Sequence, residues 1–297
     1  MRSIYKSVAF FLLLTLVFSG CRAIDVSDRD FNVTPSTSVS SEEKEKAPGI
    51  PPVDTFLIPF EIFGNDLSTD SGVRVGGTFL SVVARIALGE RSNWNHALFN
   101  VGFWNAIVRV GLAVPVAAFV ASFQNIPLKQ PDGSWEWSYD VRVDGVVYSA
   151  KLIGKYIDQD VRWEMYISRE NGFQDFLWYY GENNETYTEG FWILKNNPSE
   201  QDDLLRIDWS KGTDEVSAVR YTNVLPGGPE NGGYIDVRHT PSSTYDYIWD
   251  IFNKGRDNHT IIEWSSLTKK GKVKDPVKFS DEKWHCWDEN KLNTECP

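Results

Sequence analysis

Residues 135–152 read WEWSYDVRVDGVVYSAKL, and this stretch decides the class of the fold. As far as Val143, aromatic and aliphatic residues alternate with polar ones, as they do when one face of a strand is buried, because successive side chains of a strand point to opposite faces of the sheet. Asp144-Gly145 is a two-residue turn of the type that closes β-hairpins. Val146 to Leu152 then predicts the returning strand.

Eight further runs with strand character follow, and clusters of Gly, Asn, Asp or Pro separate most of them. They are residues 161–168, 176–180, 187–194, 204–209, 216–221, 234–239, 245–252 and 260–264. Because no helical segment interrupts these ten strands, they predict an antiparallel meander. We expect either an up-and-down barrel or a strongly curved sheet, since closure removes exposed edges.

The segment before the strands, at about residues 73–124, has helical periodicity. Apolar residues at three- and four-residue steps predict an amphipathic helix that ends near Gly89. A second helix is expected from Ser92 and is apolar on nearly every side, which indicates burial. A third is expected over Pro115–Phe123, because proline is tolerated in a first helical turn.

The uncharged apolar run Val110–Phe123 has 14 residues, fewer than the roughly 20 that a transmembrane helix needs, so we interpret it as part of the core. The hydrophobic helices are expected to pack against the concave face of the sheet or to fill one barrel mouth. The sequence therefore predicts an α+β fold, mainly β, in which residues 54–297 share one domain. Two independent domains are the alternative.

The N-terminus has the features of a secretory signal. Two basic residues, Arg2 and Lys6, precede an apolar stretch from Val8, which ends in Phe18-Ser19-Gly20-Cys21. These four residues resemble the lipobox of bacterial lipoproteins, although Phe18 stands where Leu is commonest. The resemblance implies that residues 1–20 are a signal peptide and that Cys21 is acylated. It further implies a lipid anchor in the cell envelope, which we expect to be the outer membrane of a Gram-negative bacterium.

Residues 21–53 are rich in Ser, Thr, Pro and charge, so we expect a lipidated, disordered tether. Loss of residues 1–20 removes two basic residues and no acid, so the formal charge changes from −11 to −13. This acidity argues against nucleic acid as a partner and against electrostatic attraction to anionic lipid. The expected membrane partner is therefore held through the lipid on Cys21.

The two remaining cysteines, Cys286 and Cys296, predict a disulfide outside the cytoplasm that pins the C-terminal tail. A metal site at His285-Cys286 is the alternative, but no second His or Cys stands at ligand spacing. No nucleophile elbow or phosphate loop occurs either, so the sequence supports no catalytic residue, metal or cofactor.

The first functional hypothesis is a non-enzymatic binding module for an apolar or lipid-like ligand. By analogy with envelope lipoproteins that shuttle lipid, its concave face would use Trp135, Trp137, Tyr139 and Trp163. Two alternatives stay open: a structural or interaction lipoprotein with a filled barrel, and a secreted carbohydrate-active hydrolase. An empty apolar cavity would favour the first, a filled core the second, and convergent carboxylates the third. The oligomeric state does not follow from the sequence.

Overall fold

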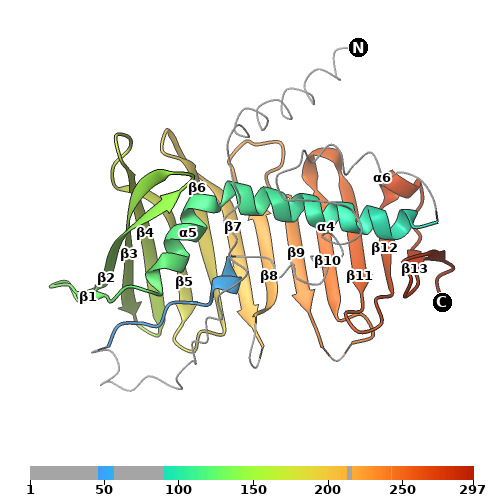
Figure 1. Cartoon of the computed structure of the whole chain (residues 1–297), viewed down its shortest axis with the longest axis horizontal. Coiled ribbons are helices and arrows are strands. Elements are labelled where there is room, and N and C mark those ends of the chain that lie inside the picture. Colours follow the sequence, from blue (N-terminus) through green and yellow to red (C-terminus); the bar gives the residue numbers. More distant parts are fainter. Residues whose placement is uncertain (1–45, 57–89, 213–215, 242) are drawn as a thin grey trace, which may run out of the picture.

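The computed structural model describes residues 46–56, 90–212, 216–241 and 243–297. The strands in these residues form one sheet of 14 strands, arranged in sequence order with antiparallel neighbours (Figure 1). The strands are β1 (Leu128–Lys129), β2 (Trp135–Val143), β3 (Val146–Ile157), β4 (Asp160–Arg169), β5 (Phe176–Asn184), β6 (Glu189–Asn197), β7 (Glu200–Lys211), β8 (Val216–Asn223), β9 (Tyr234–His239), β10 (Tyr247–Asn253), β11 (Asn258–Trp264), β12 (Gly271–Lys274), β13 (His285–Trp287) and β14 (Asn293–Thr294).

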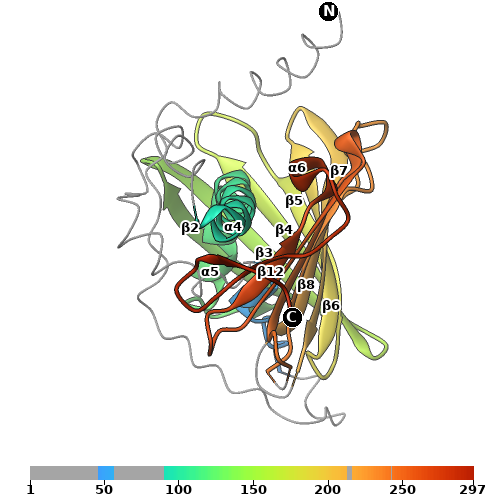
Figure 2. The ribbon, with the colours of Figure 1, turned by 90° about the vertical axis from the view of Figure 1, so that its right-hand side faces the viewer.

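The antiparallel meander expected from the sequence is confirmed, but it has 14 strands and not ten. The four additional strands, β1, β12, β13 and β14, are two to four residues long. The described strands do not form a closed barrel, because β1 and β14 lie at opposite ends of the strand order and do not pair. Two helices occupy the side toward which the sheet curves (Figure 2), and they stand where closure would have to bring the two edges together.

These helices are α4 (Ser92–Gly111) and α5 (Ala113–Ser122). Helix α5 packs against β2 and β3, and the N-terminal part of α4 packs against β12, β13 and β14. Each brings a buried aromatic ring to the sheet. Phe119 of α5 is fully buried, and Trp94 of α4 meets Trp287 edge to face at 5.5 Å between ring centroids. No helix in the described residues is long and apolar enough to cross a bilayer.

The concave face of the sheet carries alternating tryptophan and glycine residues from strand to strand. In one cross-strand row, Trp135, Gly154, Trp163, Gly181 and Trp192 are successive partners on β2 to β6. Strands lie only about 4.8 Å apart, so an indole ring lying on the sheet extends over the neighbouring strand. Glycine leaves room for that ring. A Cβ on Gly154 would lie 2.6 Å from Trp163 Cζ3, and one on Gly181 would lie 2.5 Å from Trp192 Cε3.

The same pairing recurs further along the sheet. Gly190 faces Trp209, and a Cβ there would lie 2.7 Å from Trp209 Cζ2. Gly271 stands between Trp264 and Trp287 and has no room for a Cβ beside the Trp287 ring. The core is therefore a layer of indole rings fitted over glycines, with aliphatic side chains between them.

The N-terminal segment 46–56 also belongs to this core. It contains the 3₁₀ helix η2 (Val53–Thr55), and Phe56 at its end is fully buried. Tyr221 donates a hydrogen bond from its hydroxyl to the Phe56 carbonyl (3.0 Å), and Trp192 Nε1 donates to Thr55 Oγ1 (3.1 Å). Residues 46–53, which the sequence analysis assigned to the tether, also contact the body: Ala47 and Ile50 pack against the core, and the Gly49 amide donates to the Tyr187 hydroxyl (2.8 Å). The rest of the tether and the helix expected to end near Gly89 lie outside the described residues.

We expect Gly181→Ala to destabilise the protein by about 3 kcal/mol, because the added methyl meets Trp192 and the Phe191 carbonyl oxygen, and backbone cannot move aside cheaply. Gly102→Ala in α4 is the matched control. Nothing lies within 4 Å of its Cβ, so the better helix former should add up to about 1 kcal/mol. Urea denaturation of both variants measures this. Equal stability of Gly181→Ala and wild type would contradict the packing described.

Candidate functional site

The four residues expected to hold an apolar ligand lie together near α5, where they contribute to the core. Trp137 and Trp163 are 3 % and 0 % exposed, and their rings are 5.7 Å apart. Tyr139 donates a hydrogen bond from its hydroxyl to the carbonyl of Ala118 in α5 (2.6 Å). Trp135 lies in the tryptophan and glycine row. In this structure their surfaces contact the protein itself.

A second aromatic cluster fills the concave face where the N-terminal segment meets α5. The ring of Phe56 lies 4.6 Å from that of Phe119, 4.9 Å from that of Tyr179 and 4.8 Å from that of Trp192, centroid to centroid. All four side chains are at most 1 % exposed. The chain's own side chains therefore occupy this part of the concave face.

Among the described residues, several buried donors on the concave face nevertheless have no hydrogen-bond acceptor, and three of them are the Tyr179 hydroxyl and the indole N–H groups of Trp209 and Trp249. A buried donor without an acceptor costs about 1–3 kcal/mol. Burial also raises the pKa of Tyr179 well above 10, which keeps this group a donor. The three groups lie on β5, β7 and β10, so they do not converge on one point.

The most polar buried cluster surrounds Asp275, which is 4 % exposed and caps the short helix α6 (Pro276–Phe279). Its carboxylate accepts from Thr260 Oγ1 (2.9 Å), Asn258 Nδ2 (3.0 Å) and the Lys278 amide (3.0 Å), and it lies 2.8 Å from His96 Nε2. Burial by itself raises the pKa of Asp275. The surrounding hydrogen bonds outweigh this effect and hold its pKa well below the usual range.

This cluster holds α4 to the sheet, and its geometry differs from that of a catalytic triad. In a triad the histidine lies between the hydroxyl and the carboxylate and removes the hydroxyl proton. Here the Thr260 hydroxyl donates directly to Asp275, so His96 does not stand between them. Since His96 belongs to α4, its contact with Asp275 joins the first turns of that helix to the end of the sheet. The Asp-Pro pair at 275–276 is a helix-start signal readable from sequence, whereas its contact with His96 is not.

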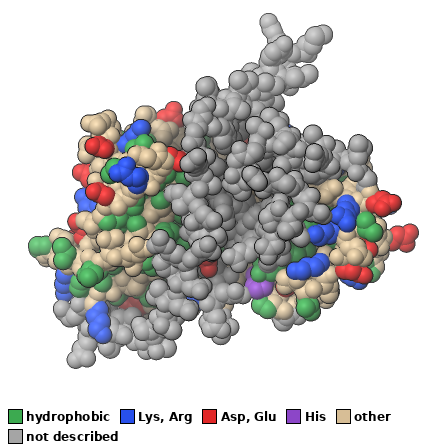
Figure 3. All heavy atoms as spheres, in the orientation of Figure 1, with side chains coloured by type: hydrophobic (Ala, Val, Ile, Leu, Met, Phe, Trp, Pro, Cys, Tyr) green, Lys and Arg blue, Asp and Glu red, His purple; other side chains and the backbone are tan. Residues whose placement is uncertain are grey.

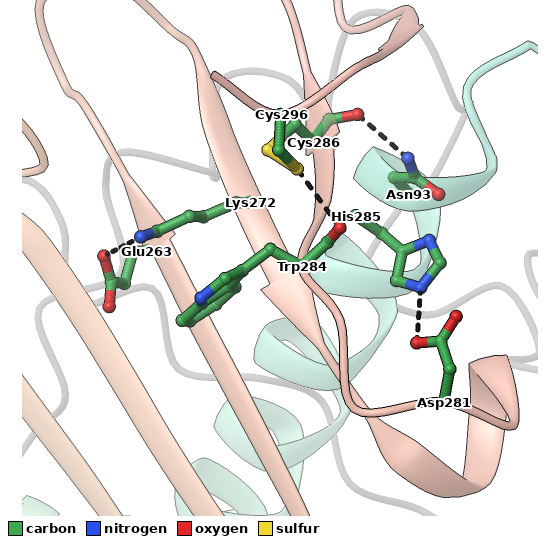
Figure 4. The surroundings of a disulfide bond; sticks show 8 residues. All are labelled: Asn93, Glu263, Lys272, Asp281, Trp284, His285, Cys286 and Cys296. Carbon is green, nitrogen blue, oxygen red and sulfur yellow. Dashed lines mark hydrogen bonds and ion pairs between the residues drawn. A yellow bond between two sulfur atoms is a disulfide. The ribbon is translucent and has the colours of Figure 1, made fainter.

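Figure 4 shows a second set of contacts between α4 and the end of the sheet, a few residues further along the chain. Cys286 and Cys296 form the expected disulfide, and Asn93 of α4 donates from Nδ2 to the Cys286 carbonyl (2.9 Å). On the same sheet end, Lys272 pairs with Glu263 (3.0 Å) and lies 4.2 Å from the ring centroid of Trp284. The tail and the start of α4 are therefore tied to the same short strands.

Each of the four histidines lies close to a different aspartate. In a metal site, by contrast, several such side chains converge on one ion. Besides His96, His239 lies 3.9 Å from Asp246, and His285 lies 3.1 Å from Asp281. His259 contacts Asp250. No group of three His, Cys, Asp or Glu residues in the described ranges is arranged to hold a metal ion.

The outer face of the sheet, opposite α4 and α5, carries a patch with one residue from each of the six strands β6 to β11. We call it the outer patch; it consists of Phe191, Arg206, Arg220, Tyr234, Phe252 and His259. The guanidinium groups of its two arginines lie over aromatic rings of the same patch. The Arg206 guanidinium is 4.3 Å from the centroid of Phe191, and that of Arg220 is 3.7 Å from the centroid of Tyr234.

The remaining aromatic members of the outer patch contact one another. The Tyr234 ring lies 5.8 Å from Phe252, and its hydroxyl lies 3.1 Å from His259 Nε2. The sequence analysis missed this patch, although outward-facing Arg and Tyr in alternating strands were visible there. Figure 3 views the helix side, where acidic and basic side chains are mixed at both ends of the sheet and no single sign dominates.

Comparisons with protein-family models, with curated proteins and with solved structures find no match to this chain.

Asp275→Asn should lower the free energy of unfolding at pH 7 by about 1–3 kcal/mol. The variant places an amide N–H₂ group where a carboxylate oxygen accepts hydrogen bonds, so one of the surrounding donors loses its acceptor. The pKa of Asp275 is lowered on folding, so its contribution is complete above the unfolded value of about 3.9 and is lost as pH falls toward the folded value. The stability gap between wild type and variant should thus be constant near neutral pH and narrow below about pH 4.

Asp281→Asn is the control, because Asp281 also contacts a histidine but its side chain is 35 % exposed, and pairs near the surface contribute little. Urea denaturation across this pH range measures both variants. A wild-type level of stability for Asp275→Asn at pH 7 would show that the cluster does not fasten α4.

Proposed function

We propose that this chain is a lipid-anchored protein of the bacterial cell envelope, held by acyl groups on Cys21, and that its body is a non-enzymatic interaction module. Its outer patch binds another envelope protein. The anchor rests on the resemblance of Phe18-Ser19-Gly20-Cys21 to a lipobox. Support for an interaction module comes from the concave face, where the expected ligand residues pack against the protein itself.

The observation that carries the proposal is the ring and cation packing of the outer patch. Tyr and Arg are enriched at the energetic centres of protein interfaces, where rigid aromatic surface and directed donors bind a partner at low entropic cost. Arg220 is held by the Tyr234 ring and by Asp236 (3.3 Å), and Arg206 by the Phe191 ring and by Asp208 (2.6 Å). Both side chains are therefore ordered before a partner arrives.

The charges of the outer patch favour a protein over an anionic polymer. Each arginine has a carboxylate beside it, so the patch offers little net positive charge to a polyphosphate or an acidic glycan. A protein surface with its own mixed charges and apolar side chains fits such a patch better. A hydrolase is less well supported, since the pKa of buried Asp275 is lowered, whereas a general acid needs a raised one.

A second candidate function is supported by the buried donors Tyr179, Trp209 and Trp249. An apolar ligand with carbonyl or ester oxygens, entering the concave face, would supply the acceptors that these groups lack. Native mass spectrometry of the purified protein separates the two candidates. A lipid bound at about one equivalent would favour the carrier, and unliganded protein would favour the interaction module.

The anchor is tested by metabolic labelling with an alkyne-tagged fatty acid. We expect the wild-type protein to take up the label and Cys21→Ala not to, because the thiol of Cys21 is the acylated group. Replacing residues 1–21 with the signal peptide of a non-lipidated secreted protein should then release the body from the membrane fraction. Label retained by Cys21→Ala would refute the anchor.

The outer patch is tested by photocrosslinking in intact cells. With the photoreactive residue p-benzoylphenylalanine in place of Tyr234, we expect one discrete protein adduct after irradiation, and Arg220→Ala in the same chain should weaken it. The control position is Leu267, which is 88 % exposed between β11 and β12 and outside the patch. The absence of an adduct at Tyr234, or the same adduct from both positions, would contradict the proposal.

A further inference from the structure

Strand β2 presents a long stretch of backbone at the edge of the sheet. Strand β1 pairs only with Trp135 and Glu136, so in the described residues the outward backbone groups from Trp137 to Val143 have no strand beside them (Figure 1). On its other side, β2 pairs with β3 in an unbroken register over all nine residues. This edge strand is therefore free of bulges in its pairing with β3.

The opposite edge of the sheet is built differently. There β13 and β14 are three and two residues long, and the disulfide from Cys286 to Cys296 covers the end. Short strands of this kind protect an edge from pairing with another chain, whereas a long, regular edge strand invites such pairing. The two edges thus differ in how readily they accept a further strand.

Two charged residues on the outer face of β2, Asp140 and Arg142, form no ion pair with another described residue. Elsewhere on this face an acid and a base two residues apart on one strand pair with each other, as in Arg162 with Glu164 (3.3 Å) and Arg206 with Asp208 (2.6 Å). Asp140 instead accepts from Ser149 Oγ (2.7 Å) and Arg142 donates to the Gly145 carbonyl (3.1 Å). Both charges stand exposed at the edge.

We propose that a second copy of this chain binds here, pairing its β2 antiparallel with this β2 around a two-fold axis at Val141. Antiparallel neighbours point to the same face. Asp140 then faces Arg142 of the partner subunit on the outer side, and Arg142 faces the partner's Asp140. On the inner side, Tyr139 faces Val143 of the partner subunit. The two sheets continue into one.

The charges select this register over its neighbours. A two-fold axis at Asp140 would place the two Asp140 carboxylates opposite each other, and an axis at Arg142 would do the same for the two guanidinium groups. Like charges directly opposite each other destabilise a strand pair, and opposite charges stabilise it. Of these three axes, only the one at Val141 gives two complementary pairs. This assembly is independent of the outer patch on β6 to β11.

Two exposed apolar residues near the same edge fit the arrangement. Ile126 and Leu128 are 88 % and 69 % exposed beside the start of β2. In the proposed register the partner's β2 ends opposite Tyr139, so the hairpin turn of the partner reaches the level of Trp137. That turn would lie next to the chain entering β1 and would cover part of these two side chains.

The register is tested by disulfide crosslinking of the full chain in membranes. Val141→Cys places two thiols at directly opposite positions, about 4.5–5.5 Å apart between Cα atoms, which a disulfide can bridge. We expect a dimer band on a non-reducing gel. Ser138→Cys is the control, since in this register its two copies lie about 20 Å apart. Equal dimer yield from both variants, or none from Val141→Cys, would overturn the proposal.

The charge pairing is tested by exchanging the two residues and measuring self-association of the detergent-solubilised chain by analytical ultracentrifugation. Asp140→Arg and Arg142→Asp each place like charges opposite each other, and each should weaken the dimer about tenfold. The double variant Asp140→Arg/Arg142→Asp restores complementarity and should recover wild-type association. A monomeric wild type, or singles that associate as well as the double variant, would overturn the proposal. Circular dichroism checks that every variant folds.

Discussion

The fit of each indole ring over a glycine of the neighbouring strand is the constraint on which this structure depends. An open sheet with one buried face needs large apolar side chains on that face, and tryptophan supplies most of them here. Adjacent strands are too close for two such rings to lie side by side on the sheet. Gly154, Gly181 and Gly271 remove the clash, and the position of each glycine fixes the register of its strand.

The other features of the molecule follow from this aromatic layer. Exposed, it would be an apolar patch far larger than a soluble monomer tolerates, so it needs a cover. Helices α4 and α5 and residues 46–56 provide part of that cover, and the N-terminal end of α4 is held by Asp275 and by the disulfide-linked tail. Because the cover lies on one side only, the outer face keeps its charged and aromatic side chains for contacts with other molecules.

Much of the fold was predictable because it rests on local patterns. Strict alternation gave the bounds of β2, and the Asp144-Gly145 turn has the positive φ angles, 49° and 80°, of a tight hairpin. Strands of two to four residues, such as β13 and β14, are too short to show a period. The tryptophan and glycine pairs depend on cross-strand register, which no local pattern displays. For the same reason the contact of His96 with Asp275 could not be foreseen.

Native-state hydrogen exchange tests the central claim, that the aromatic layer and its helical cover form one cooperative unit. If Phe119 and Trp192 hold each other in place, the slowest amides of α5 and those of β5 and β6 should exchange through the same global opening. Their free energies of exchange should agree and fall together with added denaturant. Amides of α5 that all exchange through a separate opening of much lower free energy, with β5 and β6 still protected, would contradict the account.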